Sequence, residues 1–121
     1  MKYTYKGKKN LLIWDGMDEG ITDNTYKVEC PHCQNKVAYH VRDMQSINSL
    51  EHDLREYLID NKIVSQSERG FEVKRDFPAY AVEVGCDKCK SALTIAIGMK
   101  EVQPQRYQIY FKSVVVGCKV N

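Results

Sequence analysis

The sequence contains no long apolar run and no segment typical of a linker. None of its stretches approaches the about 18 uninterrupted apolar residues that a membrane-spanning helix needs. Only 3 prolines and 7 glycines occur among its 121 residues, and no Pro-, Gly- or Ser-rich or low-complexity stretch divides the chain. These absences favour one globular domain that covers residues 1–121.

A secretory signal is also lacking. The N-terminus, MKYTYKGKKNLLIW, carries positive charge but no apolar core before the next polar run. The chain has 5 cysteines, whereas small secreted domains usually carry an even number that pair as disulfides. We therefore expect a cytoplasmic protein whose cysteines serve as thiols or metal ligands.

Neither sign of charge dominates. The formal net charge is +2, and the basic residues are scattered apart from Lys6, Lys8 and Lys9, which bunch in an apparent turn. Nucleic-acid-binding proteins usually present a basic face or a high isoelectric point. The charge distribution therefore gives little support to a nucleic-acid partner.

Common catalytic motifs are missing. The chain has no G-x-S-x-G nucleophile elbow, no P-loop and no Rossmann glycine pattern. The deaminase pattern, H-x-E followed by P-C-x-x-C, fails because an arginine stands two residues after His40 and a glycine precedes Cys86. The acidic residues 15–24, DGMDEGITDN, lack the full calcium-loop pattern and are expected to form a solvated connector. We therefore expect a protein that is not an enzyme.

An internal repeat is the most informative feature that is present. The segment YKVECPHCQNKVAYHV, shifted by 56 residues, aligns with VEVGCDKCKSALTIAI. Cys30 and Cys33 then align with Cys86 and Cys89, and the flanking apolar residues fall on matching sides of a pleated strand. Each copy predicts a strand, a C-x-x-C turn and a second strand. Two such turns that face each other place four sulfur atoms around one point.

Four sulfur atoms in this arrangement indicate a zinc site. Four thiolates can close a tetrahedron around Zn²⁺ at about 2.3 Å each, and C-x-x-C spacing presents two sulfurs from one tight turn. The predicted ligands are Cys30, Cys33, Cys86 and Cys89. Because all four coordination positions are then filled, the ion is expected to be structural, not catalytic.

Alternatives for the histidines and cysteines stay open at this point. His32 or His40 can replace one cysteine, as in mixed zinc sites. The tetrapeptide CPHC also matches a thiol-oxidase redox motif, but such a motif opens a helix, whereas QNKVAYHV after Cys33 alternates like a strand. Cys118 has no partner at C-x-x-C spacing and is expected to be a packed or partly exposed thiol, with intermolecular or redox reactivity as the alternative.

The remaining patterns predict an α+β fold that is mostly antiparallel β with one inserted amphipathic helix. Apolar residues from Ile47 to Leu58 recur at spacings of three and four, which predicts a helix over residues 46–62 with Asn48 or Ser46 as its N-cap. Alternating residues predict about six or seven strands. They comprise a hairpin within 3–14 that turns at KGKKN, the two C-x-x-C hairpins over 25–41 and 80–99, a strand over 71–77 that ends at Pro78, and two strands on either side of EVQPQ.

The paired C-x-x-C turns resemble the zinc-ribbon family, over about 30 of the 121 residues. The chain departs from the usual ribbon in two ways. Gln34 and Lys90 stand where a glycine usually follows the second cysteine, and a long segment with the predicted helix separates the two turns. Nucleases of the HNH type also place C-x-x-C pairs around an insertion, but their adjacent Asp-His or His-His pair is absent here.

Residues 97–117, IGMKEVQPQRYQIYFKSVVVG, resemble small bacterial zinc-containing proteins of the toxin-immunity kind. That resemblance implies a protein partner, such as a toxin. The supply of tyrosine, a favoured interface residue, agrees with a non-catalytic interaction protein. The alternative is a nucleic-acid-binding or transcription-accessory protein, by analogy with other zinc ribbons, in which Lys36, Lys88 and Lys90 meet phosphates.

Overall fold

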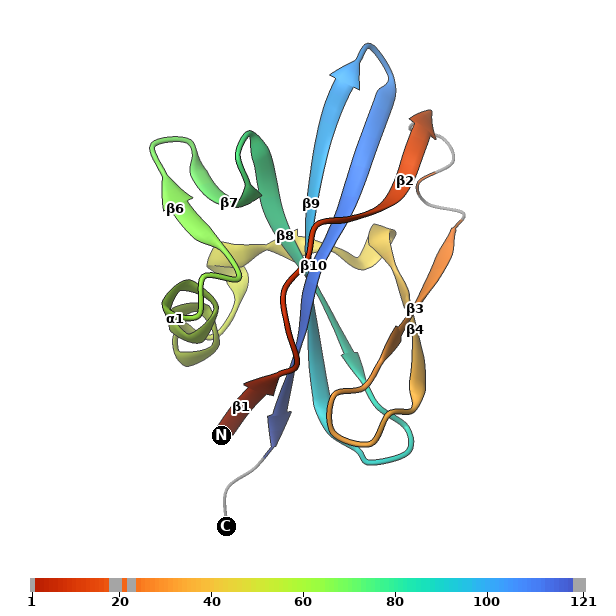
Figure 1. The fold of residues 1–121 in the computed structure, drawn as a ribbon, viewed down its shortest axis with the longest axis vertical. Helices are drawn as coiled ribbons and strands as arrows, with labels where there is room; N and C mark the ends of the chain where they lie inside the picture. The colour runs from red at the N-terminus through yellow and green to blue at the C-terminus, as the bar shows by residue number, and fades with distance from the viewer. Residues whose placement is uncertain (1, 18–20, 22–23, 119–121) are drawn as a thin grey trace.

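The computed structural model describes residues 2–17, 21 and 24–118 (Figure 1). They form a large antiparallel sheet, a separate two-stranded hairpin and one α-helix, so the predicted α+β class, mostly antiparallel β, is confirmed. The sheet runs in the order β1-β10-β9-β8-β7-β6, with β2 also paired to β10 and β5 to β8. The elements are β1 (Lys2–Tyr5), β2 (Leu11–Met17), β3 (Thr25–Glu29), β4 (Lys36–His40), β5 (Gln45–Ser46), α1 (His52–Asp60), β6 (Ser65–Ser67), β7 (Gly70–Lys74), β8 (Phe77–Gly85), β9 (Ala92–Gln103) and β10 (Arg106–Cys118), with 3₁₀ turns at Val41–Asp43 and Ile47–Ser49.

The large sheet separates two apolar clusters, one on each face. Because neighbouring residues of a strand point to opposite faces, β9 places Ile95 in one cluster and Ala96 in the other. The hairpin β3–β4 adds Tyr39 to the first cluster, and α1 adds Leu58 to the second. Figure 1 shows α1 and the hairpin on opposite sides of the central strands. The molecule is therefore layered as hairpin, sheet and helix.

The two repeats fold as the sequence predicts, into hairpins with the same register. In the first, β3 and β4 pair so that Val28 lies opposite Val37. In the second, β8 and β9 pair so that Val84 lies opposite Leu93. These residue pairs are the ones that the 56-residue shift aligns. Each C-x-x-C turn thus joins two adjacent antiparallel strands.

The N-terminal strands differ from the prediction, because β1 and β2 do not pair with each other as a hairpin. Both pair with β10, β1 along its C-terminal half and β2 along its N-terminal half. A bulge in β10 at Lys112 separates the two halves. At that point the Lys9 N–H donates to the Lys112 carbonyl at 2.9 Å, and Ser113 Oγ donates to the Gly7 carbonyl at 2.6 Å. The linker between β1 and β2 is therefore held along β10.

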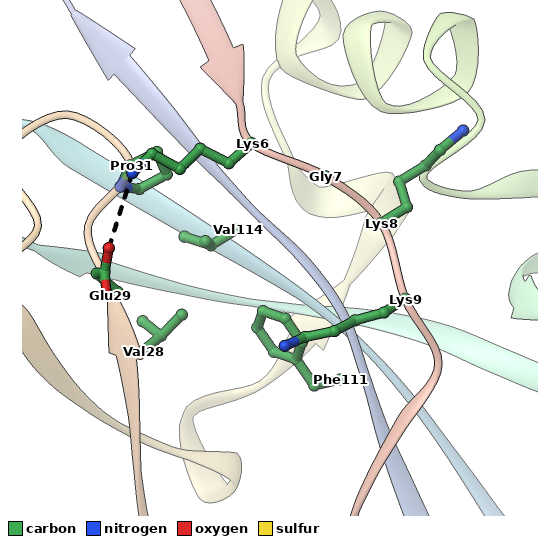
Figure 2. Close-up of a pocket in the computed structure, with 9 residues that line it drawn as sticks. All are labelled: Lys6, Gly7, Lys8, Lys9, Val28, Glu29, Pro31, Phe111 and Val114. Atoms are coloured by element: carbon green, nitrogen blue, oxygen red, sulfur yellow. Dashed lines mark ion pairs between the residues drawn. The ribbon is translucent and has the colours of Figure 1, made fainter.

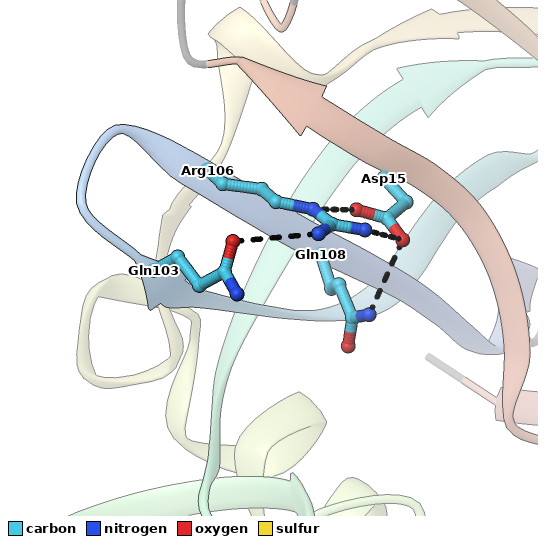
Figure 3. A network of polar contacts seen from close by, with 4 residues as sticks. All are labelled: Asp15, Gln103, Arg106 and Gln108. Atoms are coloured by element: carbon cyan, nitrogen blue, oxygen red, sulfur yellow. Dashed lines mark hydrogen bonds and ion pairs between the residues drawn. The ribbon is translucent and has the colours of Figure 1, made fainter.

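A bidentate ion pair links β2 to the N-terminal end of β10 (Figure 3). Arg106 donates from Nε and Nη2 to the two carboxylate oxygens of Asp15 at 2.7 and 2.8 Å. Gln108 Nε2 also donates to Asp15, at 3.4 Å. Asp15 thus belongs to a strand and not to the predicted connector, whose residues 18–20 and 22–23 lie outside the described part of the chain.

The helix is shorter than predicted. It spans His52–Asp60, whereas residues 46–50 form a short strand end and a 3₁₀ turn. Ser46 caps that turn by accepting a bond from the Asn48 N–H at 3.0 Å. The N-cap of α1 is Glu51, which makes no side-chain bond there, so the predicted N-cap at Asn48 or Ser46 is wrong. No helix in the described residues is long and apolar enough to cross a membrane.

The predicted end of a strand at Pro78 is also wrong. The chain turns at residues 75–76 instead, where Asp76 has a φ of 67°, and β8 begins at Phe77. Pro78 is the second residue of β8, and the pairing of β8 with β9 begins only at Ala79. Proline lacks an N–H group, so it is tolerated at the start of a strand, outside that ladder.

Candidate metal centre

Each C-x-x-C turn is held by the same two backbone hydrogen bonds. In the first turn, the Cys30 N–H donates to the Asn35 carbonyl at 2.8 Å, and the Gln34 N–H donates to the Cys30 carbonyl at 2.9 Å. In the second turn, the Cys86 N–H donates to the Ser91 carbonyl and the Lys90 N–H to the Cys86 carbonyl, at 2.9 and 2.8 Å. The internal repeat of the sequence is therefore a repeat of turn geometry.

The residue after the second cysteine adopts a left-handed conformation in both turns. Gln34 and Lys90 each have a φ of 65°. This region is unfavourable for residues with a Cβ atom and easy for glycine, which explains the usual ribbon preference for glycine at these positions. The absence of glycine does not prevent the turn, because the two backbone bonds hold it.

The two turns face each other and bring the four predicted sulfur ligands together. Cys30 Sγ lies 3.7 Å from Cys89 Sγ, and Cys33 Sγ lies 3.5 Å from Cys86 Sγ. All four sulfur atoms lie within 4.8 Å of one another. Asn35 joins the turns from the side, since its Nδ2 donates to an Asp87 carboxylate oxygen at 3.0 Å and contacts the Cys86 sulfur at 3.8 Å.

These distances fit a tetrahedral metal ion. Four sulfurs at about 2.3 Å from a central zinc ion lie about 3.8 Å from one another at the corners of a regular tetrahedron. The observed separations of 3.5 and 3.7 Å are close to that edge, and much longer than the about 2.05 Å of a disulfide. Cys30 and Cys86 are buried, at 0% and 1% exposure, while Cys33 and Cys89 are partly exposed. The four cysteines are placed to hold one metal ion.

The pKa values of two of the four thiols are shifted in opposite directions. The Cys89 N–H, donating to the Cys86 sulfur, does most to lower the pKa of Cys86, to about 6. At Cys33 the Asn35 N–H acts to lower the pKa, but burial and the neighbouring sulfur atoms outweigh it and raise the pKa to about 12. Four adjoining sulfurs cannot all ionise on their own, because the negative charges repel. A divalent cation among them would stabilise all four thiolates.

Neither histidine near the first turn belongs to the cluster. The group of metal-ligating side chains found among the described residues consists of the four cysteines. His32 lies within the turn but is exposed, and His40 Nδ1 lies 3.3 Å from Thr25 Oγ1 at the far end of the hairpin. His52 is on the solvent side of α1, with 71% of its side chain exposed. The geometry therefore favours four cysteine ligands over a mixed set.

Cys118 lies beside the centre, which the spacing of the cysteines did not predict. Ser91 Oγ lies 3.2 Å from Cys89 Sγ and 3.5 Å from Cys118 Sγ, so the serine stands between the two sulfurs. The register of the hairpin around EVQPQ could have predicted this contact. If the two strands pair residue by residue outward from the turn at Pro104 and Gln105, Cys118 lies opposite Ser91.

Fold and site together define a layered antiparallel β protein in which two C-x-x-C hairpins bring four cysteines close enough to hold a metal ion. The centre is compatible with a zinc-ribbon-like site. A comparison of the chain with family models, curated proteins and solved structures found no match.

Proposed function

We propose that the four-cysteine centre binds a structural zinc ion. The donor set supports zinc, because four thiolates around one point are typical of closed zinc sites. Such a shell leaves no coordination position for water or substrate, which argues against metal catalysis. The two hairpins come from different layers of the molecule, so a shared ion would join the β3–β4 layer to the central sheet.

We further propose that the protein is a non-catalytic interaction protein that binds another protein. The observation that carries this proposal is the closed shell of four sulfur atoms. Metal binding by this shell explains the four cysteines of the two turns and needs no catalytic role for them. Exposed Leu11, Leu12 and Met17, at 48%, 43% and 46%, offer apolar area along β2, where a partner can pack. The resemblance of residues 97–117 to small bacterial immunity proteins makes a protein toxin the first partner to test.

The alternative, a nucleic-acid-binding or transcription-accessory protein, has less support. The lysines near the two turns do not line one surface, since Lys36 lines a space beside β3 and Lys90 lines another beside Ser91. A protein bound to phosphates through several lysines also loses affinity steeply as salt rises. That salt dependence separates the two classes of partner.

Metal content is the first experiment. Native mass spectrometry of the reduced protein, before and after strong chelation, should show one zinc ion per chain that chelation removes. Cys86→Ser should lose the ion, and Cys118→Ser, the matched control, should keep it. A metal-free wild type, lighter by two hydrogens per disulfide bridge, would overturn the zinc proposal in favour of thiol redox chemistry.

Partner binding is the second experiment. The zinc-loaded protein is used to capture binding partners, and each captured protein is then produced separately and titrated against it by calorimetry. We expect a stoichiometric protein complex whose affinity changes little with salt, with a toxin whose activity is lost in the complex as the specific outcome. Co-purifying nucleic acid, with binding that falls steeply with salt, would favour the alternative.

A further inference from the structure

A continuous groove runs between the linker that joins β1 to β2 and the strand β3. It consists of two adjoining spaces of about 310 and 320 Å³, which share Lys9, Val28, Glu29 and Phe111 as lining residues. Figure 2 shows the linker on one side and Glu29 and Pro31 on the other. Lys6 reaches across to Glu29, Lys9 lies over Phe111 of β10, and Lys8 points away, toward Asn61. We call this space the lysine groove.

The lysine groove adds two lysines of the β3–β4 hairpin to the three that bunch in the linker sequence. Five lysines line it, and Glu29 is its single acidic lining residue; the lysines are Lys6, Lys8, Lys9, Lys27 and Lys36. The chain as a whole has 18 basic and 16 acidic residues, so this local imbalance is far from the average. Lys27 and Lys36 come from the β3–β4 hairpin, and the tertiary structure alone brings them beside the linker.

Among the described residues, four of the five lysines have no acidic partner, and only Lys6 has one. Lys6 Nζ lies 3.7 Å from a Glu29 carboxylate oxygen, and Lys8 Nζ donates to the Asn61 carbonyl at 2.9 Å. In the described part of the chain, Lys9, Lys27 and Lys36 form no ion pair. No acidic side chain therefore offsets the positive charge of these three lysines. Close by, burial and the charge of Lys8 lower the pKa of Lys112, as expected where positive charge is uncompensated.

The floor and the rims of the groove add two further features. Val28, Val114 and Phe111 make the floor apolar, and Lys9 Nζ lies 5.7 Å from the centre of the Phe111 ring. The hydroxyl of Tyr26, another lining residue, is buried and has no hydrogen-bond partner among the described residues. Among the described residues, β3 pairs only with β4, and β2 pairs only with β10. Both β2 and β3 therefore have one edge without a backbone partner. Such edges accept an extended peptide.

We propose that the lysine groove binds an extended acidic segment of a partner protein, with carboxylates on the lysines and apolar side chains on the Val28–Phe111–Val114 floor. The inference rests on the proposed function, since it names the kind of partner that a protein-binding role would involve. An extended strand that alternates acidic and apolar residues presents these two chemistries to opposite sides. The only aromatic ring of this floor, Phe111, is partly buried and has Lys9 over it, and Glu29 lies beside the floor. Such a surface suits a peptide better than a nucleic acid, whose bases need exposed aromatic faces to stack on.

Selection of peptides tests the proposal directly. The zinc-loaded protein is used to select binders from a phage-displayed library of short random peptides at physiological salt. The selected peptides are then synthesised and titrated against wild type, the groove variant Lys9→Glu/Lys27→Glu and the control Lys2→Glu/Arg75→Glu. The control makes the same change of net charge at exposed positions outside the groove. Circular dichroism and zinc content confirm that each variant is folded, and Lys9→Ala/Lys27→Ala provides a milder second test.

We expect the selected peptides to be rich in Asp and Glu that alternate with apolar residues. They should bind the groove variant at least about tenfold more weakly than wild type, and the control about as tightly as wild type. Failure to select any peptide, peptides without an acidic excess, or equal binding to the groove variant would each overturn the inference. So would a single-stranded oligothymidine that binds more tightly than every selected peptide and loses binding in the groove variant.

The outcomes also separate this inference from the proposed function. A partner protein that binds wild type and the groove variant equally leaves the proposed function standing and shows that the groove assignment is wrong. Lysine-dependent binding of the selected peptides, without any partner protein captured by wild type, supports the groove and places the failure in the proposed function.

Discussion

Gln34 and Lys90 carry the most local strain in the candidate metal centre. Each has a φ of 65° at the position after the second cysteine of its turn. For a residue with a Cβ atom, this left-handed conformation costs about 1–2 kcal/mol. The turns persist because two backbone hydrogen bonds and, with a metal bound, two metal–sulfur bonds hold each of them.

Gln34→Gly and Lys90→Gly are therefore expected to stabilise the protein. Removing Cβ relieves the left-handed strain, while the added freedom of glycine in the unfolded chain offsets about 0.5–1 kcal/mol of that gain. The net rise in the free energy of unfolding should be about 0.5–1 kcal/mol per site, measured by urea denaturation at fixed zinc concentration. Ala92→Gly, in the strand after the second turn, is the control and should lose stability. A loss at all three positions would contradict the strain explanation.

The ion pair between Asp15 of β2 and Arg106 of β10 makes the stability of the folded protein depend on pH. The hydrogen bond from Arg106 is the largest cause of the lowered pKa of Asp15. A carboxyl group with a lowered pKa in the folded state stabilises that state above its unfolded pKa of about 3.9. The contribution disappears as the pH falls through the lower, folded pKa.

Asp15→Asn is expected to be less stable than wild type at neutral pH, and the difference should vanish in strong acid. Comparing urea midpoints of the two proteins from pH 7 downward isolates Asp15, because both lose bound metal alike in acid. Asp76→Asn, which removes the longer 3.6 Å contact with Arg69, is the control and should show a smaller difference. A gap between Asp15→Asn and wild type that does not change with pH would show that the ion pair is not its cause.

The helix α1 stabilises the face of the sheet that lies away from the cysteines. Leu58 is fully buried there, at 0% exposure, in a cluster separate from the one that contains the cysteines. Leu58→Ala should lower the free energy of unfolding by about 2–5 kcal/mol through the cavity it leaves. We expect the variant still to bind one zinc ion per chain by native mass spectrometry.

Glu56→Ala is the matched control on the exposed side of the same helix. It should change stability by no more than about 0.5 kcal/mol. Loss of zinc in folded Leu58→Ala would show that the two faces of the sheet are coupled, contrary to the layered arrangement.

Over the whole molecule, a metal ion bound by the four cysteines would join two layers that otherwise meet through side-chain packing. Structural zinc sites contribute about 10–16 kcal/mol in small peptides, which matches or exceeds the about 5–15 kcal/mol net stability of a typical domain. The hairpin β3–β4 pairs with no other strand in the described residues, so we expect it to depend most on the proposed metal. The helix face has an apolar cluster of its own.

Metal removal should therefore loosen the molecule unevenly. After chelation under reducing conditions, hydrogen exchange should show early loss of protection in residues 26–39, while residues 54–58 and the centre of β9 stay protected for longer. Adding zinc back should restore the pattern. Uniform loss of protection along the chain would indicate that the metal supports the whole fold as one cooperative unit.

The sequence by itself determined the features that depend on neighbours along the chain. Alternating apolar residues around each C-x-x-C predicted the hairpins β3–β4 and β8–β9, and the 56-residue repeat predicted that four sulfurs would meet. The same local reasoning failed for the helix start. Ile47 and Leu50 are buried, as the periodicity requires, but they lie in and after a 3₁₀ turn, and a burial pattern alone does not distinguish the two conformations.

Only the tertiary structure decided which distant segments meet. The turn signal at KGKKN was real, yet β1 and β2 both pair with β10, a long strand whose edge N–H and C=O groups need partners. Tertiary packing likewise brings Cys118 to Ser91 and the hairpin lysines to the linker. Turn chemistry and strand periodicity act over a few residues, whereas these contacts depend on the free energy of packing whole layers together.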